Sequence, residues 1–269
     1  MRLVTRTQAV LARRSVLWTL VIRDLRVRYS RSVLGYLWTV LDPLLMSLIY
    51  FVVFTYIFQR KGLGHDPYFL FLVAGLLPWQ WFSGVVTESS RALIQEARLI
   101  RSTSLPREIW VARVVVSKGI EYLWSLPVLV FFTIVYLLRG QAHLNGWLVL
   151  FPLGIVVQFW FLVGLGLILA PVTALVNDMQ RVIRILLRML FYVTPVIYAS
   201  HLVPKPYDTI TWLNPMTGIL EMMRAGFFTH DRFPIQWAAI GVGAAVTVVT
   251  LFAGFAVFAR LERAVLKEI

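Results

Sequence analysis

The sequence contains no cysteine and only four histidines and 13 acidic residues among its 269 residues. Without cysteine there is no disulfide, no thiolate metal site and no cysteine nucleophile. The histidines are scattered without H-E-x-x-H spacing, so we expect no metal site. The phosphate-binding loops G-x-x-x-x-G-K-[ST] and G-x-G-x-x-G are also missing, as is the G-x-S-x-G turn of serine hydrolases. We therefore expect neither catalysis nor a cofactor in this chain.

Charge is scarce, and apolar residues take its place. Hydrophobic residues make up 59% of the chain and charged residues 14%, and the mean hydropathy is +0.76. A soluble protein of this length would expose large apolar patches to water, so the composition predicts an integral membrane protein. The formal net charge of +13 then indicates basic clusters beside anionic lipid and not binding to nucleic acid.

Six apolar runs approach or exceed the 20 or so residues that a spanning helix needs. They cover residues 34–58, 69–88, 111–137, 147–176, 185–200 and 235–259. Six spans place both termini on one side of the membrane. Lys and Arg gather in the N-terminal arm, the loop after the second span, the 177–188 segment and the tail after Arg260. The positive-inside rule makes this side cytoplasmic.

The N-terminal arm, residues 1–33, is rich in arginine. Between residues 13 and 29, apolar side chains recur at helical spacing and polar ones share another face. The apolar positions are Leu17, Trp18, Val21, Ile22, Leu25 and Tyr29, and the polar ones are Thr19, Arg23, Arg26 and Ser30. This pattern favours a basic amphipathic helix on the membrane surface over a solvated basic arm.

The cytoplasmic loop 89–110 shows a second amphipathic pattern. The polar residues are Ser90, Arg91, Gln95, Glu96, Arg98 and Arg101. They alternate with the apolar residues Leu93, Ile94, Ala97, Leu99 and Ile100. This pattern predicts a helix between two spans. Periodicity alone leaves two interpretations open, which are docking on a cytoplasmic partner and attachment to lipid.

The outward segment 201–234 contains four prolines around an apolar stretch. Broken backbone at membrane depth is tolerated only where protein or water covers it. We therefore expect short re-entrant helices here. Asn214 directly before Pro215 fits a helix N-cap followed by proline at the first helical position.

A few ionisable residues lie in or beside the spans, where charge is costly. Asp42, just before a proline, is interpreted as an N-cap where the first span kinks or begins. Lys118 and Glu121 stand three residues apart and are expected to pair on one helical face. Arg184 and Arg188 lie one turn apart, either reaching to the interface or attracting an anionic substrate.

Aromatic residues make up 14% of the chain. Many are expected in the bundle interior and in belts at the membrane interface. Two clusters can also line a conduit, because aromatic faces stack on sugar rings. Their residues are Tyr50, Phe51, Phe54, Phe191, Tyr192 and Tyr198.

Five segments in order resemble the membrane subunit of ABC-2 type polysaccharide exporters, which export lipid-linked O-antigens, teichoic acids and related glycans. They are RDLRVRYSRSVLGYLWTVLDPLL (23–45), GLLPWQWF (75–82), LPREIW (105–110), NDMQRVIRILLRMLFYVTPVIY (177–198) and LNPMTGILEMMR (213–224). The resemblance covers nearly the whole chain. It implies an all-α fold in which residues 1–269 form a single transmembrane domain of six helices, with the amphipathic arm and the outer re-entrant helices attached.

The resemblance also implies an assembly and a cargo. Two copies of the chain would pair with two copies of a separate ATPase subunit, which binds ATP and Mg. The channel between the copies would export a polyprenyl-pyrophosphate-linked polysaccharide across the bacterial cytoplasmic membrane. The loop helix would dock on the ATPase through Arg91, Gln95, Glu96, Arg98 and Arg101.

Two further sets of residues gain an implied role from the resemblance. The arm would lie beside the gate through which substrate enters and meet the anionic head group with Arg23, Arg26, Arg28 and Arg31. The outer re-entrant segment would shape the exit, with Asn214, Pro215, Glu221 and Arg224 as its marked residues.

Three other functions compete with this one. An ABC-2 exporter of a drug or small lipid would share the fold but carry a compact cargo. A membrane glycosyltransferase would need acidic residues arranged for a metal or a base, yet no D-x-D occurs among the outward-facing aspartates. A passive channel would need no ATPase partner.

Overall fold

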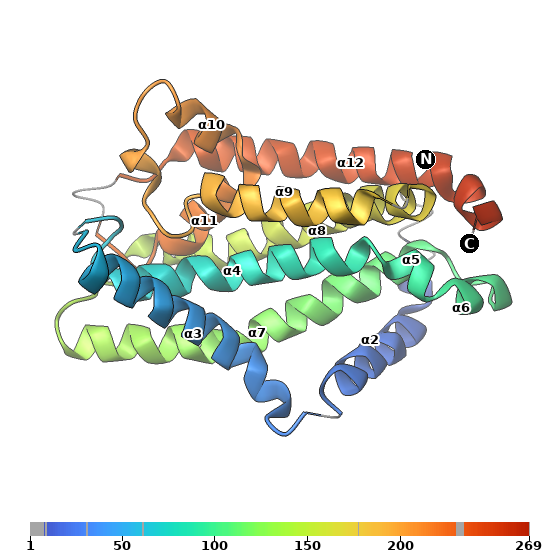
Figure 1. Ribbon diagram of the computed structural model, residues 1–269, viewed down its shortest axis with the longest axis horizontal. Helices are drawn as coiled ribbons and strands as arrows, with labels where there is room; N and C mark the ends of the chain where they lie inside the picture. Colours follow the sequence, from blue (N-terminus) through green and yellow to red (C-terminus); the bar gives the residue numbers. More distant parts are fainter. Residues whose placement is uncertain are drawn as a thin grey trace.

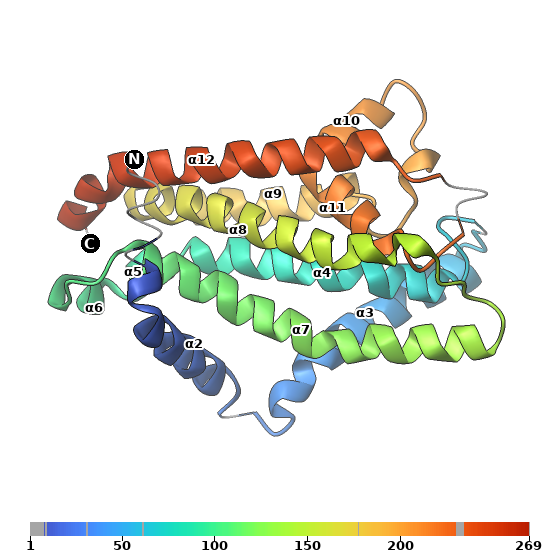
Figure 2. The same ribbon diagram turned by 180° about the vertical axis from the view of Figure 1, so that it is seen from behind.

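The computed structural model describes residues 8, 10–30, 32–60, 62–176, 178–229 and 234–268. In these ranges the secondary structure is helical and no strand occurs. Figures 1 and 2 show an elongated bundle in which most of the long helices run roughly along one axis. The main helices are α2 (Arg14–Tyr29), α3 (Trp38–Val52), α4 (Tyr68–Ser89), α7 (Glu108–Leu138), α8 (Leu150–Leu175), α9 (Met179–Val193) and α12 (Trp237–Glu268). The shorter ones are α5 (Ala92–Gln95), α6 (Ala97–Ser102), α10 (Asp208–Leu213) and α11 (Pro215–Arg224).

Five helical stretches are long and apolar enough to cross a membrane, and they confirm five of the predicted runs. They are Gly35–Ile57, Tyr68–Ser89, Glu108–Leu138, Gly146–Leu175 and Trp237–Glu268. The first joins a 3-10 turn (η1, Gly35–Leu37), α3 and a π-helical turn (η2, Val53–Ile57), and the fourth joins η3 (Gly146–Val149) to α8. The hydropathy of the sequence thus located these spans to within a few residues, except that α12 runs on to Glu268.

The boundaries predicted for the fifth run, 185–200, are wrong. The helix there is α9, which begins at Met179 and ends at Val193. Thr194 precedes Pro195 and adopts an extended conformation with ψ of 134°, as expected for a residue before proline. At 15 residues, α9 is about 22 Å long.

Helix α4 lies at the centre of the bundle. In its most apolar stretch, 83% of the residues are buried, whereas the corresponding share in Gly35–Ile57 is 11%. It packs against α3, α7, α8, α9 and α11. Helices α8 and α12 pack closely against each other, because Gly164 and Gly254 let the two backbones approach at their crossing.

Helix α2 confirms the helix predicted in the N-terminal arm. It packs on α7 and buries Val21 and Leu25. Trp18, which the pattern placed on the apolar face, is 54% exposed. The buried side of α2 is therefore narrower than the predicted stripe.

The loop 89–110 does not form the single helix that its pattern predicts. Helices α5 and α6 are separated at Glu96, which has φ −106° and ψ 18°. The break has a physical reason: at this point the Glu96 carboxylate contacts the buried Arg113 guanidinium at 3.1 Å. An ion pair across the bundle thus interrupts the local helical pattern.

Of the two N-caps predicted from the sequence, the one at Asn214 is confirmed and the one at Asp42 is wrong. Asn214 caps α11 as expected, because its side chain accepts a hydrogen bond from the Met216 amide at 3.0 Å and Pro215 is the first helical residue. The cap predicted at Asp42 is wrong. Helix α3 begins at Trp38, directly after η1, so Asp42 and Pro43 both lie inside it.

Candidate functional site

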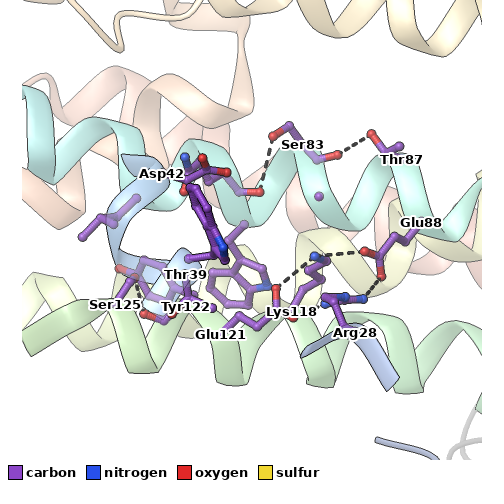
Figure 3. A pocket seen from close by; sticks show the side chains of 15 residues that line it. Arg28, Thr39, Asp42, Ser83, Thr87, Glu88, Lys118, Glu121, Tyr122 and Ser125 are labelled. Carbon is purple, nitrogen blue, oxygen red and sulfur yellow. Dashed lines mark hydrogen bonds and ion pairs between the residues drawn. The ribbon is translucent and has the colours of Figure 1, made fainter. Parts of the chain in front are cut away.

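A polar cavity of about 510 Å³ lies between α2, α3, α4 and α7. Figure 3 shows its lining, which combines aromatic rings, hydroxyl groups and charged side chains. Such a mixture offers stacking faces together with hydrogen-bond donors and acceptors. The lining includes Trp38, Trp81, Tyr122, Thr39, Ser83, Thr87, Ser125, Gln80 and Asp42, and four charged residues at one end.

These four charged residues form a closed ring of alternating sign. Arg28 of α2 contacts Glu88 of α4 at 2.5 Å and also Glu121 of α7. Lys118 of α7 contacts both carboxylates at 2.9 Å. The ring confirms the predicted pairing of Lys118 with Glu121. Sequence reasoning missed Glu88 because its partners come from two distant segments.

A second cavity of about 570 Å³ shares Arg28, Thr87 and Glu88 with the first and extends toward α5. Beside it lies a second charged cluster. Arg23 contacts Asp24 at 3.1 Å and Glu96 at 2.5 Å. Although burial alone lowers it, the hydrogen bonds to Glu96 and Asp24 raise the pKa of Arg23 above its ordinary value.

The four arginines marked for an anionic head group occupy different environments. Arg23 and Arg28 are the cations of the two clusters just described. The Arg26 side chain is exposed and has no hydrogen bond or ion pair to any residue that the structure describes. Arg31 lies outside the described residues.

Most of the aromatic residues that were predicted to line a conduit lie close together in the structure. Tyr50 of α3 stacks on Phe54 and on Phe191 of α9, with centroid distances of 6.4 and 5.7 Å. Phe191 packs against Tyr192 at 5.3 Å, and the Tyr198 hydroxyl donates to the Tyr192 carbonyl at 3.0 Å. These contacts make one aromatic group between α3 and the end of α9.

Phe51 belongs to a different aromatic group. Its ring packs edge-on against Phe69 of α4 at 5.6 Å and lies 6.5 Å from Tyr68. It therefore faces the interior of the bundle, away from Phe191.

The residues marked for docking on an ATPase divide into two sets. Arg91, Gln95 and Glu96 line the second cavity. Arg98 and Arg101 are exposed on α6, which projects from the end of the bundle (Figure 1). Gln95 is exposed as well, whereas Arg91 and Glu96 are half-buried.

The outer segment holds a buried arginine that ties three elements together. Arg224 of α11 donates to the carbonyls of Pro195 at 2.6 Å, Val196 at 2.5 Å and Phe71 at 3.2 Å. Its guanidinium lies 3.7 Å from the centre of the Phe71 ring. Nearby, Glu221 accepts a hydrogen bond from Ser200 at 2.9 Å. The sequence analysis named Arg224 and Glu221 but could not indicate their hydrogen-bond partners.

Within the described ranges, no group of three or more His, Cys, Asp or Glu side chains is arranged to hold a metal ion. The two cavities and their charged clusters instead offer stacking and hydrogen bonding. Long apolar helices around such polar cavities define an integral membrane protein with a polar interior.

Residues 15–228 match the family model described as ABC-2 type transporter. The chain therefore belongs to this family. It is similar to the O-antigen export system permease proteins RfbA of Klebsiella pneumoniae (31% identical, 89% of each chain) and Myxococcus xanthus (33% identical, 91% of this chain and 92% of the relative). It is also similar to the polysialic acid transport protein KpsM of Escherichia coli (28% identical, 92% of this chain and 93% of the relative).

Proposed function

We propose that this chain is the permease half of an ATP-driven exporter of polysaccharide. The observation that carries the proposal is similarity over nearly the full length to permeases whose names specify O-antigen export and polysialic acid transport. The aromatic and hydroxyl-rich lining of the first cavity is compatible with sugar. The cargo is a polyprenyl-pyrophosphate-linked glycan, whose anionic head meets Arg26 and Arg31.

Two copies of the chain form the channel and bind two copies of a separate ATPase subunit, which carries ATP and Mg. The sequence supports this division of labour, because it contains no phosphate-binding loop motif. Helix α6 is the docking element, since Arg98 and Arg101 are exposed on it. ATP hydrolysis then biases the paired permeases between two arrangements.

In the bacterial cytoplasmic membrane, α9 is the fifth of six spans and both termini are cytoplasmic. Helices α5 and α6 lie at the same end of the bundle as the C-terminal end of α12 and the start of α9 (Figure 1), and this end is rich in Arg. Helix α9 is shorter than the roughly 30 Å hydrocarbon core, so α10 and α11 complete the crossing as re-entrant helices at the outer side.

The test is affinity purification of the tagged chain from its native membrane, followed by mass spectrometry of bound proteins and lipids. We expect a stoichiometric ATPase with a phosphate-binding loop and a polyprenyl-linked glycan. A drug or small lipid in place of the glycan would assign the alternative cargo. The absence of any ATPase under gentle detergent conditions would contradict the proposal.

Two charge-reversal variants test the docking element. Reversing Arg98 and Arg101 to Glu should reduce the amount of ATPase that co-purifies, because two cations on α6 are replaced by anions. The control is Arg139→Glu, an exposed arginine after α7 at the opposite end of the bundle. Equal recovery of ATPase with both variants would show that α6 does not dock.

A further inference from the structure

Three arginines on α9 form a stripe. Arg181, Arg184 and Arg188 are spaced by three and four residues, so they share one face of the helix and extend along about 10 Å of it. All three are exposed. None of their side chains forms a hydrogen bond or an ion pair with any residue in the described part of the chain.

The position of this arginine stripe is electrostatically unfavourable for the free protein. The stripe begins at Arg181 in the first turn of α9, where the helix dipole disfavours a cation. Asp178, the residue before the helix, is the only acidic residue close by in the sequence. On the same surface, Ile185 is 57% and Met189 is 60% exposed. Among the residues that the structure describes, no acidic side chain therefore pairs with these three cations, which lie on a largely apolar surface.

The arginine stripe leads into the aromatic group between α3 and α9. Tyr192 follows Arg188 by one turn on the same face and is 65% exposed. Phe191 beside it stacks on Tyr50 and contacts Trp79 at 5.5 Å. Cations and aromatic rings therefore succeed each other along one open surface of a single helix.

This order of side chains suits a particular kind of polymer. The rings of a sugar stack on aromatic faces, and guanidinium groups bind carboxylates and phosphates through charge-assisted, often bidentate hydrogen bonds. Neutral glycans need only the first kind of contact. One relative, KpsM, carries a name that specifies polysialic acid, a polymer with one carboxylate on each sugar.

We propose that Arg181, Arg184 and Arg188 bind the carboxylate or phosphate groups of an acidic polysaccharide, so that the cargo of this exporter is an anionic glycan. The proposal rests on the proposed function and narrows its substrate class. Anionic lipid head groups share this chemistry, and the experiment is designed to separate the two sources.

The experiment uses the full chain bound to its ATPase subunit in nanodiscs of phosphatidylcholine alone, which removes anionic lipid. Two fluorescent probes are compared by anisotropy: a pentamer of α2,8-linked sialic acid and neutral maltopentaose. We expect the acidic pentamer to bind about tenfold more tightly, with an advantage that falls as salt is added. Combining Arg181→Gln, Arg184→Gln and Arg188→Gln should abolish this advantage, and the corresponding three lysine substitutions should retain part of it.

The control removes three other exposed arginines, by combining Arg139→Gln, Arg260→Gln and Arg263→Gln. This variant should keep the preference, because it changes net charge equally but leaves α9 intact. Co-purification of the ATPase shows that each variant is folded, and Arg188→Gln alone replaces the triple variant if that one does not assemble.

Equal affinity of the wild type for both probes would overturn the proposal. So would a preference that survives in the α9 triple variant. If phosphatidylglycerol from mixed nanodiscs is retained by the wild type but not by this variant, while the probes bind equally, the stripe is a lipid site and the proposal fails. In all three cases a co-purifying ATPase and glycan would leave the proposed function standing.

Discussion

Arg113 on α7 donates from one nitrogen to both carboxylate oxygens of Asp24 on α2, at 2.8 and 2.9 Å. The Arg113 side chain is only 5% exposed. Its guanidinium also lies 3.1 Å from Glu96, at the break between α5 and α6. One buried cation therefore joins the N-terminal helix to the segment that we propose to dock on an ATPase. A displacement of α5 and α6 would be transmitted to α2 through this contact.

Asp24→Asn should strongly destabilise the protein. Removing one partner of a buried ion pair costs about 3 kcal/mol, because the remaining charge loses compensation; here Glu96 compensates part of it. The matched control is Arg26→Gln on the same helix, which has no ion pair to the described residues. Denaturant titration of the purified chain measures both. Equal free energies of unfolding for the two variants would show that the Asp24 contact contributes nothing.

The ring of four charges predicts coupling between α2 and α7. Glu121→Gln removes the contacts of Glu121 with Arg28 and Lys118 but leaves Arg28 with Glu88 as a partner, so each single substitution removes two of the four contacts in the ring. We expect the double variant Arg28→Gln/Glu121→Gln to be less destabilised than the sum of the singles by about 1 kcal/mol, because the two share a contact. The same titration gives this coupling energy. Combining Glu121→Gln with Arg26→Gln instead should give additive effects, and equal additivity in both pairs would argue against the ring.

Two glycines of α12 should respond in opposite directions to alanine. A Cβ on Gly254 would overlap the carbonyl oxygen of Gly164 on α8, and small residues allow close helix packing in membranes. Gly254→Ala should therefore destabilise by roughly 1–3 kcal/mol. Gly241 has open space around its Cβ position, so Gly241→Ala should stabilise by about 0.5 kcal/mol through better helix propensity. Thermal unfolding in detergent compares them; a loss of similar size at both sites would contradict this packing.

The sequence predicted the long helices well because hydropathy acts within one segment. Five apolar runs gave five helices with nearly correct bounds. The predictions that were wrong depended on contacts between segments. Glu96 breaks the loop helix because it reaches Arg113, which lies 17 positions further along the chain, and no local pattern contains that information.

The same distinction applies to the candidate site. Lys118 and Glu121 were paired correctly because three residues on a helix bring them together. Arg28 was marked as a cation, but its partners Glu88 and Glu121 follow it by 60 and 93 positions. Periodicity indicates which face a residue shares within its own helix. It does not indicate which other helix that face meets, so the cavity and its ring of charges required the fold.

Asn214 provides a test that separates two roles of one side chain. Its oxygen caps α11 at the Met216 amide, and its nitrogen donates to the Thr194 hydroxyl at 2.7 Å. Asn214→Ala removes both bonds and should cost about 1 kcal/mol or more. Asn214→Asp keeps the capping oxygen and loses the donor, so its cost should be smaller and similar to that of Thr194→Val. Hydrogen exchange at the first amides of α11 reports the cap directly. Faster exchange there in Asn214→Ala but not in Thr194→Val would establish the cap, whereas equal exchange in both would show that the contact with Thr194 governs the start of the helix.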